Sequence, residues 1–299
     1  MSCEKYKYDN LKTIARVFYG KRDINRALEM YNKAYAEPEG KKDIELLLDI
    51  AILYDELDED VKAEEKFNEV IAIDEEEARG YYGLGIIYDN RAETEKALEF
   101  YEKAIDLNPE YNRAYFFAAN IYLDKGIRDK AEKYFHKVLE MDPEDIWSYI
   151  NLGSAYERDG NYLKARELFQ RALDIDPHHH IALFDMGVVN DRLNNTDNAE
   201  RYYRMAMKAN SLYPYSYLNL AVLLKTKGNY DEAIRIITDG IRNNPDEGFL
   251  FYNRACFFAH EGRIQESVDD LKTAVKLYPE FEEYIDQDEE LEAIRPYIE

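Results

Sequence analysis

Three consecutive histidines, His178 to His180, are the side chains of this sequence that most suggest metal chemistry. Histidines bind zinc well when they lie four residues apart on a helix, because their ring nitrogens then converge on one ion. These three are adjacent and follow Pro177, which predicts a turn, so their rings would diverge. No cysteine cluster lies near them in the sequence. We expect no metal site here.

The other reactive side chains form no pattern typical of catalysis. The sequence has no glycine-rich phosphate loop, no nucleophile elbow, and no histidine placed with a serine or cysteine in a recognisable catalytic frame. Its many carboxylates fall mostly in second helices and turns, where a charge-rich surface is ordinarily just solvated. We therefore expect neither enzymatic activity nor a bound cofactor.

Composition excludes several further classes of protein. Asp and Glu total 62 against 39 Lys and Arg, and the net charge of −23 repels nucleic acids and anionic membranes. With 46% hydrophobic residues and 27 tyrosines, the chain can bury enough apolar surface to fold. Cys3 and Cys256 lie too far apart for a disulfide scaffold. The charged N-terminus and the absence of a long apolar stretch predict a cytoplasmic protein.

The elements that position these side chains repeat with one period. Alanine recurs every 34 residues. A series of prolines and a series of glycines or asparagines recur with the same spacing. The alanines are Ala63, Ala97, Ala131, Ala165, Ala199 and Ala233. Such a period predicts a tandem array in which each unit buries its apolar face against its neighbours.

One unit, residues 78–111, shows what each repeat contains. Tyr81, Leu84, Gly85 and Tyr88 recur at helical spacing, a turn follows, and Ala97, Tyr101 and Ala104 recur before Asn108-Pro109 ends the second helix. Two amphipathic helices joined by a tight turn fit this pattern. The order of aromatic, Leu-Gly, Tyr, Ala, aromatic and Pro resembles the signature of the tetratricopeptide repeat family.

The resemblance covers nearly the whole chain and implies an all-α, right-handed superhelical solenoid. We expect a lead-in at 1–7, a C-terminal capping helix or tail at 282–299, and a two-residue register slip around residues 37–42. Eight repeats lie between, at residues 8–41, 44–77, 78–111, 112–145, 146–179, 180–213, 214–247 and 248–281.

The repeats also define candidate binding residues. Positions 2, 5 and 9, counted from the start of each repeat, lie three and four residues apart and so share one face of the first helix. In the tetratricopeptide family this face lines a concave groove that takes peptides, and an asparagine at position 6 often bonds the peptide backbone. The resemblance thus implies a groove lined by Lys12, Arg16, Arg79, Tyr82, Arg113, Phe116, Asn120, Trp147, Asn151, Phe184, Tyr215, Asn219, Phe249, Tyr252 and Asn253.

Along this face the side-chain types change. Basic residues gather toward the N-terminal repeats, and apolar and aromatic residues toward the C-terminal repeats. Exposed apolar surface of this extent favours a binding role, and Trp147, Tyr215 and Phe249 are side chains typical of interaction hot spots. Two alternatives stay open: position 5 serves packing between repeats, and the position 6 asparagines bond within their own repeat.

The sequence therefore predicts a non-catalytic scaffold that binds a peptide or protein segment in the groove, with no nucleic-acid or membrane partner. Self-assembly into a homo-oligomer is one alternative. A regulatory or tethering subunit of an enzyme complex is another.

Overall fold

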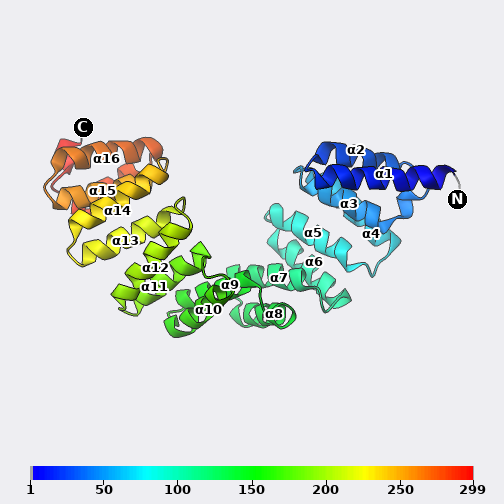
Figure 1. Cartoon of the computed structure of the whole chain (residues 1–299), viewed down its shortest axis with the longest axis horizontal. Coiled ribbons are helices and arrows are strands. Elements are labelled where there is room, and N and C mark those ends of the chain that lie inside the picture. Colours follow the sequence, from blue (N-terminus) through cyan, green and yellow to red (C-terminus); the bar gives the residue numbers. More distant parts are fainter. Residues whose placement is uncertain (1–2, 299) are drawn as a thin grey trace. The chain divides into compact units, whose positions relative to one another are not determined.

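The computed structural model of the chain describes residues 3–298, and its side chains from Tyr6 onward, so Cys3 lies outside the described side chains. This range contains helices and turns and no strand. The chain divides into two compact units, residues 1–143 and 144–299 (Figure 1).

Unit 1 contains four pairs of helices, each pair packed side by side. Its elements are α1 (Cys3–Gly20), α2 (Ile24–Tyr35), the 3₁₀ turn η1 (Gly40–Lys42), α3 (Ile44–Asp55), α4 (Asp60–Ile73), α5 (Ala78–Asn90), α6 (Thr94–Leu107), α7 (Asn112–Asp124) and α8 (Arg128–Met141). Residues 3–7, expected as a lead-in, already belong to α1.

Unit 2 contains four more pairs and a tail. Its elements are α9 (Ile146–Arg158), α10 (Tyr162–Ile175), α11 (His180–Arg192), α12 (Thr196–Ala209), α13 (Pro214–Thr226), α14 (Tyr230–Asn243), α15 (Gly248–His260), α16 (Ile264–Leu277), α17 (Phe281–Gln287), η2 (Glu289–Leu291) and η3 (Arg295–Tyr297). The expected all-α tandem architecture is confirmed.

The turn that joins the two helices of each pair contains one residue with a left-handed backbone conformation. These residues are Arg22, Asp58, Ala92, Gly126, Gly160, Asn194, Gly228 and Gly262. Their spacing is 34 residues except between Arg22 and Asp58, which are two residues further apart because η1 is inserted there. The turn is therefore geometrically the same in all eight repeats, although glycine, which adopts this backbone without strain, occupies only half of them.

Small residues bring the two helices of a pair together. The six alanines at the 34-residue spacing are all fully buried. Gly153 lies against the ring of Phe169 and Gly187 against the ring of Tyr203, so closely that an added Cβ would come within 2.5 Å of the ring. The close approach of the two helices thus depends on glycine, which has no side chain, at these positions.

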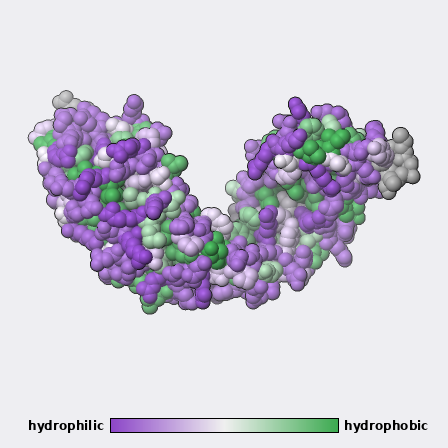
Figure 2. Space-filling model, viewed as in Figure 1, coloured by the Kyte–Doolittle hydropathy of each residue, from purple (hydrophilic) through white to green (hydrophobic). Residues whose placement is uncertain are grey.

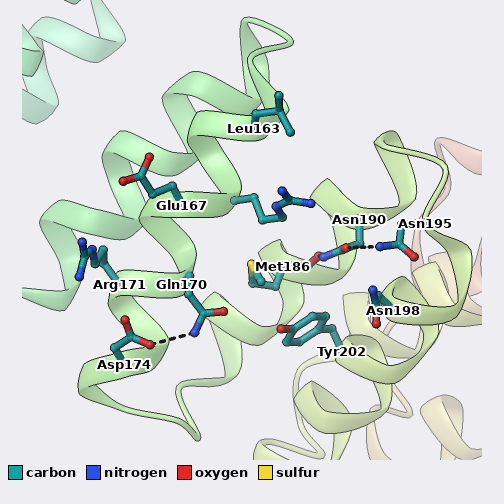
Figure 3. A pocket seen from close by; sticks show the side chains of 11 residues that line it. Leu163, Glu167, Gln170, Arg171, Asp174, Met186, Asn190, Asn195, Asn198 and Tyr202 are labelled. Atoms are coloured by element: carbon teal, nitrogen blue, oxygen red, sulfur yellow. Dashed lines mark hydrogen bonds between the residues drawn. The ribbon is translucent and has the colours of Figure 1, made fainter.

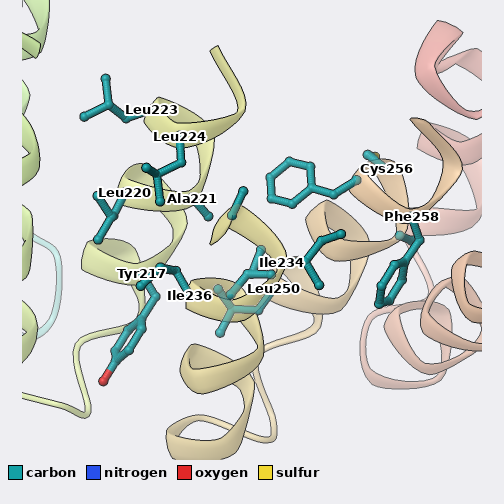
Figure 4. Packing of buried hydrophobic residues seen from close by; sticks show 14 of the residues in the cluster. Tyr217, Leu220, Ala221, Leu223, Leu224, Ile234, Ile236, Leu250, Cys256 and Phe258 are labelled. Atoms are coloured by element: carbon teal, nitrogen blue, oxygen red, sulfur yellow. The ribbon is translucent and has the colours of Figure 1, made fainter. Parts of the chain in front are cut away.

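The cores run between neighbouring repeats. In unit 2, Tyr217 and Leu220 of α13 pack with Ile234 and Ile236 of α14 and with Leu250 of α15 (Figure 4). Each helix pair buries its apolar side against the next pair, as stacked repeats must.

The tail covers the last repeat with a short helix and two turns. Helix α17 ends at Gln287, well before the end of the expected range 282–299, and η2 and η3 follow. Ile285, Leu291 and Ile294 are buried in the core of unit 2, and Arg295 holds the tail by donating to the carbonyls of Ile285 and Asp288 at 3.1 and 2.7 Å.

Hydrophilic side chains dominate the surfaces seen in Figure 2, with smaller hydrophobic areas between them. Within residues 3–298, none of the helices has both the length and the apolar content needed to cross a bilayer.

Candidate functional site

The candidate site lies on the first helices of the repeats. We call the surface carrying positions 2, 5, 6 and 9 of these helices the first-helix face. In unit 1 it belongs to α1, α3, α5 and α7, and in unit 2 to α9, α11, α13 and α15.

In unit 1 this face contains a pocket of about 320 Å³ between α3 and α5. Its lining includes the expected residues Arg79, Tyr82 and Arg113, and also Glu45, Asp49 and Asp55. Three carboxylates therefore accompany two guanidinium groups, and the N-terminal end of the face is mixed in charge rather than basic as the sequence suggested.

The expected cations of unit 1 have partners inside the chain. Lys12 is paired with Asp43, and Arg79 forms ion pairs with Glu45 and Glu77, each at 2.7 Å. The guanidinium groups of Arg16 and Arg113 lie beside Tyr31 and Tyr82, respectively, and lower the pKa of each phenol against the larger effect of burial. Another segment would have to compete with these contacts.

Two carboxyl groups of this pocket are shielded from water. Burial raises the pKa of Asp49, next to Tyr31, and burial with nearby Asp60 and Asp58 raises the pKa of Asp55. Charged forms of these groups are thus disfavoured, as expected for carboxylates with little solvent.

Position 5 serves mainly to pack the repeats. In three repeats the position 5 ring lies against an aromatic ring 29 residues later, which just precedes the next first helix in two cases and begins α17 in the third. The pairs are Tyr82–Tyr111 at 4.8 Å, Phe184–Tyr213 at 5.2 Å and Tyr252–Phe281 at 5.0 Å between centroids. Phe116 instead lies edge-on to Phe117 and Phe135. These rings are therefore less available to a ligand than their spacing suggested.

In unit 2 the expected aromatic side chains join a continuous series of rings. We call Trp147, His179, His180, Tyr213, Tyr215 and Phe249 the aromatic row. Successive centroids lie 5.2, 5.9, 5.3, 5.5 and 5.4 Å apart. Trp147 and Tyr215 are each 48% exposed, so the row presents two large rings to solvent.

Three members of the row, His179, His180 and Tyr213, were not among the expected site residues. They lie at or beside the junction of two repeats, where the helical period carries no signal. Nδ1 of His179 accepts from the backbone N–H of Ala182 at 3.4 Å and so caps α11. Burial and neighbouring His180 lower the pKa of His179, consistent with a neutral ring that can accept this bond. Within residues 3–298, no cluster of three or more histidine, cysteine or acidic side chains is placed to hold a metal ion.

The position 6 row of unit 2 includes one partly buried acid among asparagines. Asn253 donates to the carbonyl of Phe249 at 2.8 Å, and Asn219 is hydrogen-bonded to Tyr203. Both side-chain amides are therefore already hydrogen-bonded within the chain. Asp185 occupies the same position in α11. Burial and nearby Glu157 raise the pKa of Asp185 to about 7, and its buried Oδ2 has no hydrogen-bond partner among residues 3–298.

Asn120 and Asn151, also expected on this face, are half-buried and each already interacts with another part of the chain. At the end of unit 2 the tail covers the face. The hydroxyl of Tyr252 donates to Asp288 at 2.6 Å, and the thiol of Cys256 lies 3.8 Å from the same carboxylate.

Comparisons with known proteins match this architecture. Models of the tetratricopeptide repeat match residues 78–111, 110–178, 144–211 and 214–247. A Sel1 repeat model matches residues 16–37, and a model of anaphase-promoting complex subunit 5 matches residues 30–79. None of these models describes a catalytic family. No curated protein matches the sequence significantly.

Several solved structures share the fold. The APC/C hetero-tetramer Cut9–Hcn1 is similar with a TM-score of 0.61 and 16% identity, over 92% of this chain and 53% of that chain. PilF of Pseudomonas aeruginosa is similar with a TM-score of 0.58 and 18% identity, over 71% and 97%. A MamA protein is similar with a TM-score of 0.50 and 20% identity, over 56% and 91%. The chain thus spans about half of the matched Cut9–Hcn1 chain, and at these identities the likeness concerns the fold alone.

Proposed function

Because the chain belongs to the tetratricopeptide repeat family, we propose that it is a scaffold that binds a segment of another protein on the first-helix face of unit 2. The observation that carries this proposal is the aromatic row with its two half-exposed rings, Trp147 and Tyr215. Large rings already fixed by neighbouring rings lose little conformational entropy on binding, which favours them as anchors.

The bound segment is extended and carries apolar and basic side chains. Cations are attracted to the faces of indole and phenol rings, and the net charge of −23 steers basic segments toward the chain. Asp185 adds a specific acceptor near the row, because its charge contributes with burial to raise the pKa of Tyr213 to about 12.

Peptides selected from a random display library on the full chain test this proposal. We expect the double substitution Trp147→Ala with Tyr215→Ala to raise the Kd of the selected peptides about tenfold or more, measured by anisotropy of a labelled peptide. Tyr297→Ala is the matched control, because Tyr297 is a 54% exposed aromatic residue in the tail. Equal affinity for the double variant and the control contradicts the proposal.

Self-association is a second candidate, favoured by one feature of unit 1. Ile14 and Val17 of α1 are 43% and 52% exposed, whereas Ile50 and Leu53 at the equivalent positions of α3 are buried. Stacking of another copy on α1 would cover them. Light scattering over a concentration series tests this: a monomer at every concentration excludes it, and a dimer that Ile14→Glu with Val17→Glu dissociates supports it.

A further inference from the structure

Position 11 is a tyrosine in repeats 2 to 5, and repeats 1, 7 and 8 have Phe18, Leu224 and Phe258 there. In repeats 3 and 4 this tyrosine fills a slot between two second helices. In repeat 3, Tyr88 stacks on Phe100 of its own second helix, with centroids 5.3 Å apart. Its hydroxyl donates to Glu64 of the preceding second helix at 2.8 Å. In repeat 4, Tyr122 lies edge-on to Tyr134 at 5.5 Å and donates to Glu102. The ring thus packs on one second helix, and its hydroxyl bonds the one before.

Repeat 6 has Asn190 at this position. Nδ2 of Asn190 donates to the carbonyl of Met186 at 2.7 Å, and its Oδ1 accepts from Asn195 at 3.2 Å. The short amide is therefore bound to its own helix and the following turn, and it does not extend across to α10.

A hollow of about 610 Å³ lies where the tyrosine would be. Figure 3 shows its two sides, α10 with Gln170 and α12 with Asn198 and Tyr202, and Met186 and Asn190 of α11 between them. Two other hollows are different, because neither lies between two second helices: one is lined by α6 and by Tyr81 of α5, and the other by α12 alone.

Three residues in the walls of this hollow have the repeat positions of residues that surround Tyr88 and Tyr122 in repeats 3 and 4. Tyr202 has the repeat position of Phe100 and Tyr134, which pack on the tyrosine ring. Arg166 and Gln170 have the positions of Glu64 and Glu102, which bond the tyrosine hydroxyl.

The wall of this hollow offers a hydrogen-bond donor where the slots of Tyr88 and Tyr122 offer an acceptor. Glu64 and Glu102 accept a hydrogen bond from the tyrosine hydroxyl, whereas Arg166 can only donate. A phenol oxygen has lone pairs for such a donor, so a tyrosine hydroxyl remains complementary to the altered wall. A phenylalanine ring lacks this oxygen, so the exposed Arg166 would keep only its contact with solvent.

We propose that the slot formed by α10, α11 and α12 binds a tyrosine side chain presented by a partner protein, with the ring against Tyr202 and Met186 and the hydroxyl accepting from Arg166. This site lies among the second helices, apart from the first-helix face, so its failure would leave the proposed function standing.

Methyl-labelled methionine NMR tests the proposal, because Met186 lines the slot. The probes are N-acetyltyrosine amide and N-acetylphenylalanine amide, titrated into the full chain. We expect a saturable shift of the Met186 methyl signal with the tyrosine probe and a several-fold weaker response with the phenylalanine probe. No shift of Met186, or equal affinity for both probes, overturns the proposal.

Asn190→Tyr provides the independent test, because it introduces the side chain that repeats 2 to 5 have at this position. We expect it to raise the thermal unfolding midpoint by about 2 °C or more and to abolish the Met186 response. The reciprocal variant Tyr122→Asn, which opens the corresponding slot in repeat 4, should lower the midpoint. A lower midpoint for Asn190→Tyr, or an unchanged Met186 response in that variant, would show that the hollow is not shaped for tyrosine.

Discussion

Tyr215 and Phe249, one repeat apart at position 2, stack with ring centroids 5.4 Å apart and planes inclined by only 11°. The contact joins α13 to α15 on the first-helix face and continues the aromatic row that begins at Trp147. Such rings are held in place before any ligand arrives. The row therefore combines exposure with order, which is what an anchoring surface requires.

Gly153 should not tolerate a larger residue. In Gly153→Ala the new Cβ would lie 2.5 Å from Cε1 of Phe169, so the helices must separate or the ring must move. We expect a loss of about 1–3 kcal/mol in the free energy of unfolding, measured by urea denaturation. Gly20→Ala is the control, because nothing lies within 4 Å of its added Cβ. Equal stability of Gly153→Ala and the wild type would mean that this close approach is not needed.

Ala92 should benefit from replacement by glycine. Its φ of +57° is strained for alanine, and glycine occupies the equivalent turn position in four other repeats. We expect Ala92→Gly to gain about 0.5–1 kcal/mol and Gly228→Ala to lose about as much, in thermal unfolding. Since the two sites are far apart in the chain, the double variant should behave nearly like the wild type. A loss on Ala92→Gly would show that the turn is not strained.

The charge of Asp185 should destabilise the fold as the pH rises. Its pKa is about 7 in the folded chain and near 4 when unfolded, so between these values the folded chain binds the extra proton and the free energy of unfolding falls with increasing pH. We expect Asp185→Asn to be more stable by about 2–4 kcal/mol at pH 8 and by less at pH 5, in urea denaturation. The exposed Asp191 of the same helix is the control, as Asp191→Asn. A constant difference across pH would contradict the burial of this charge.

The tail should control the reactivity of Cys256. Burial, with Asp288 close by, raises the pKa of this thiol to about 12, and Arg295 holds the tail through two carbonyls. In a Cys3→Ser background, we expect Arg295→Ala to speed alkylation of Cys256 about tenfold or more, because charged hydrogen bonds are lost and the tail opens more often. Arg242→Ala, at an exposed arginine paired with Asp239, should leave the rate unchanged. An unchanged rate for Arg295→Ala would mean that the tail does not shield the thiol.

The fold could be predicted because its signals are local. One small residue at each helix crossing and one turn residue per repeat recur at a fixed spacing. Even the two additional residues in the segment that contains η1 appear as a slip in that spacing. The sequence did not reveal that helix α17 would stop at Gln287, because acidic residues and scattered apolar ones fit a helix and a turn equally well.

The site could be predicted only in part, because its energetics depend on contacts between repeats. Lys12 and Arg79 look like free groove cations in the sequence, but their partners Asp43 and Glu45 lie outside their own repeats. Tyr213 lies in a turn, outside the helical period that identified the face. Asn190 departs visibly from the repeat pattern, yet the hollow beside it appears only when α10, α11 and α12 are placed together.

Trp147 allows the most direct test of the proposed binding surface, because it is the only tryptophan in the sequence. A tryptophan-free peptide selected on the chain is added to saturation, as established by anisotropy, and the emission and acrylamide quenching of Trp147 are recorded. Binding on the aromatic row predicts a shift to shorter wavelength and a lower quenching constant, since the half-exposed indole becomes covered. Unchanged emission and quenching with every saturating peptide would contradict the account.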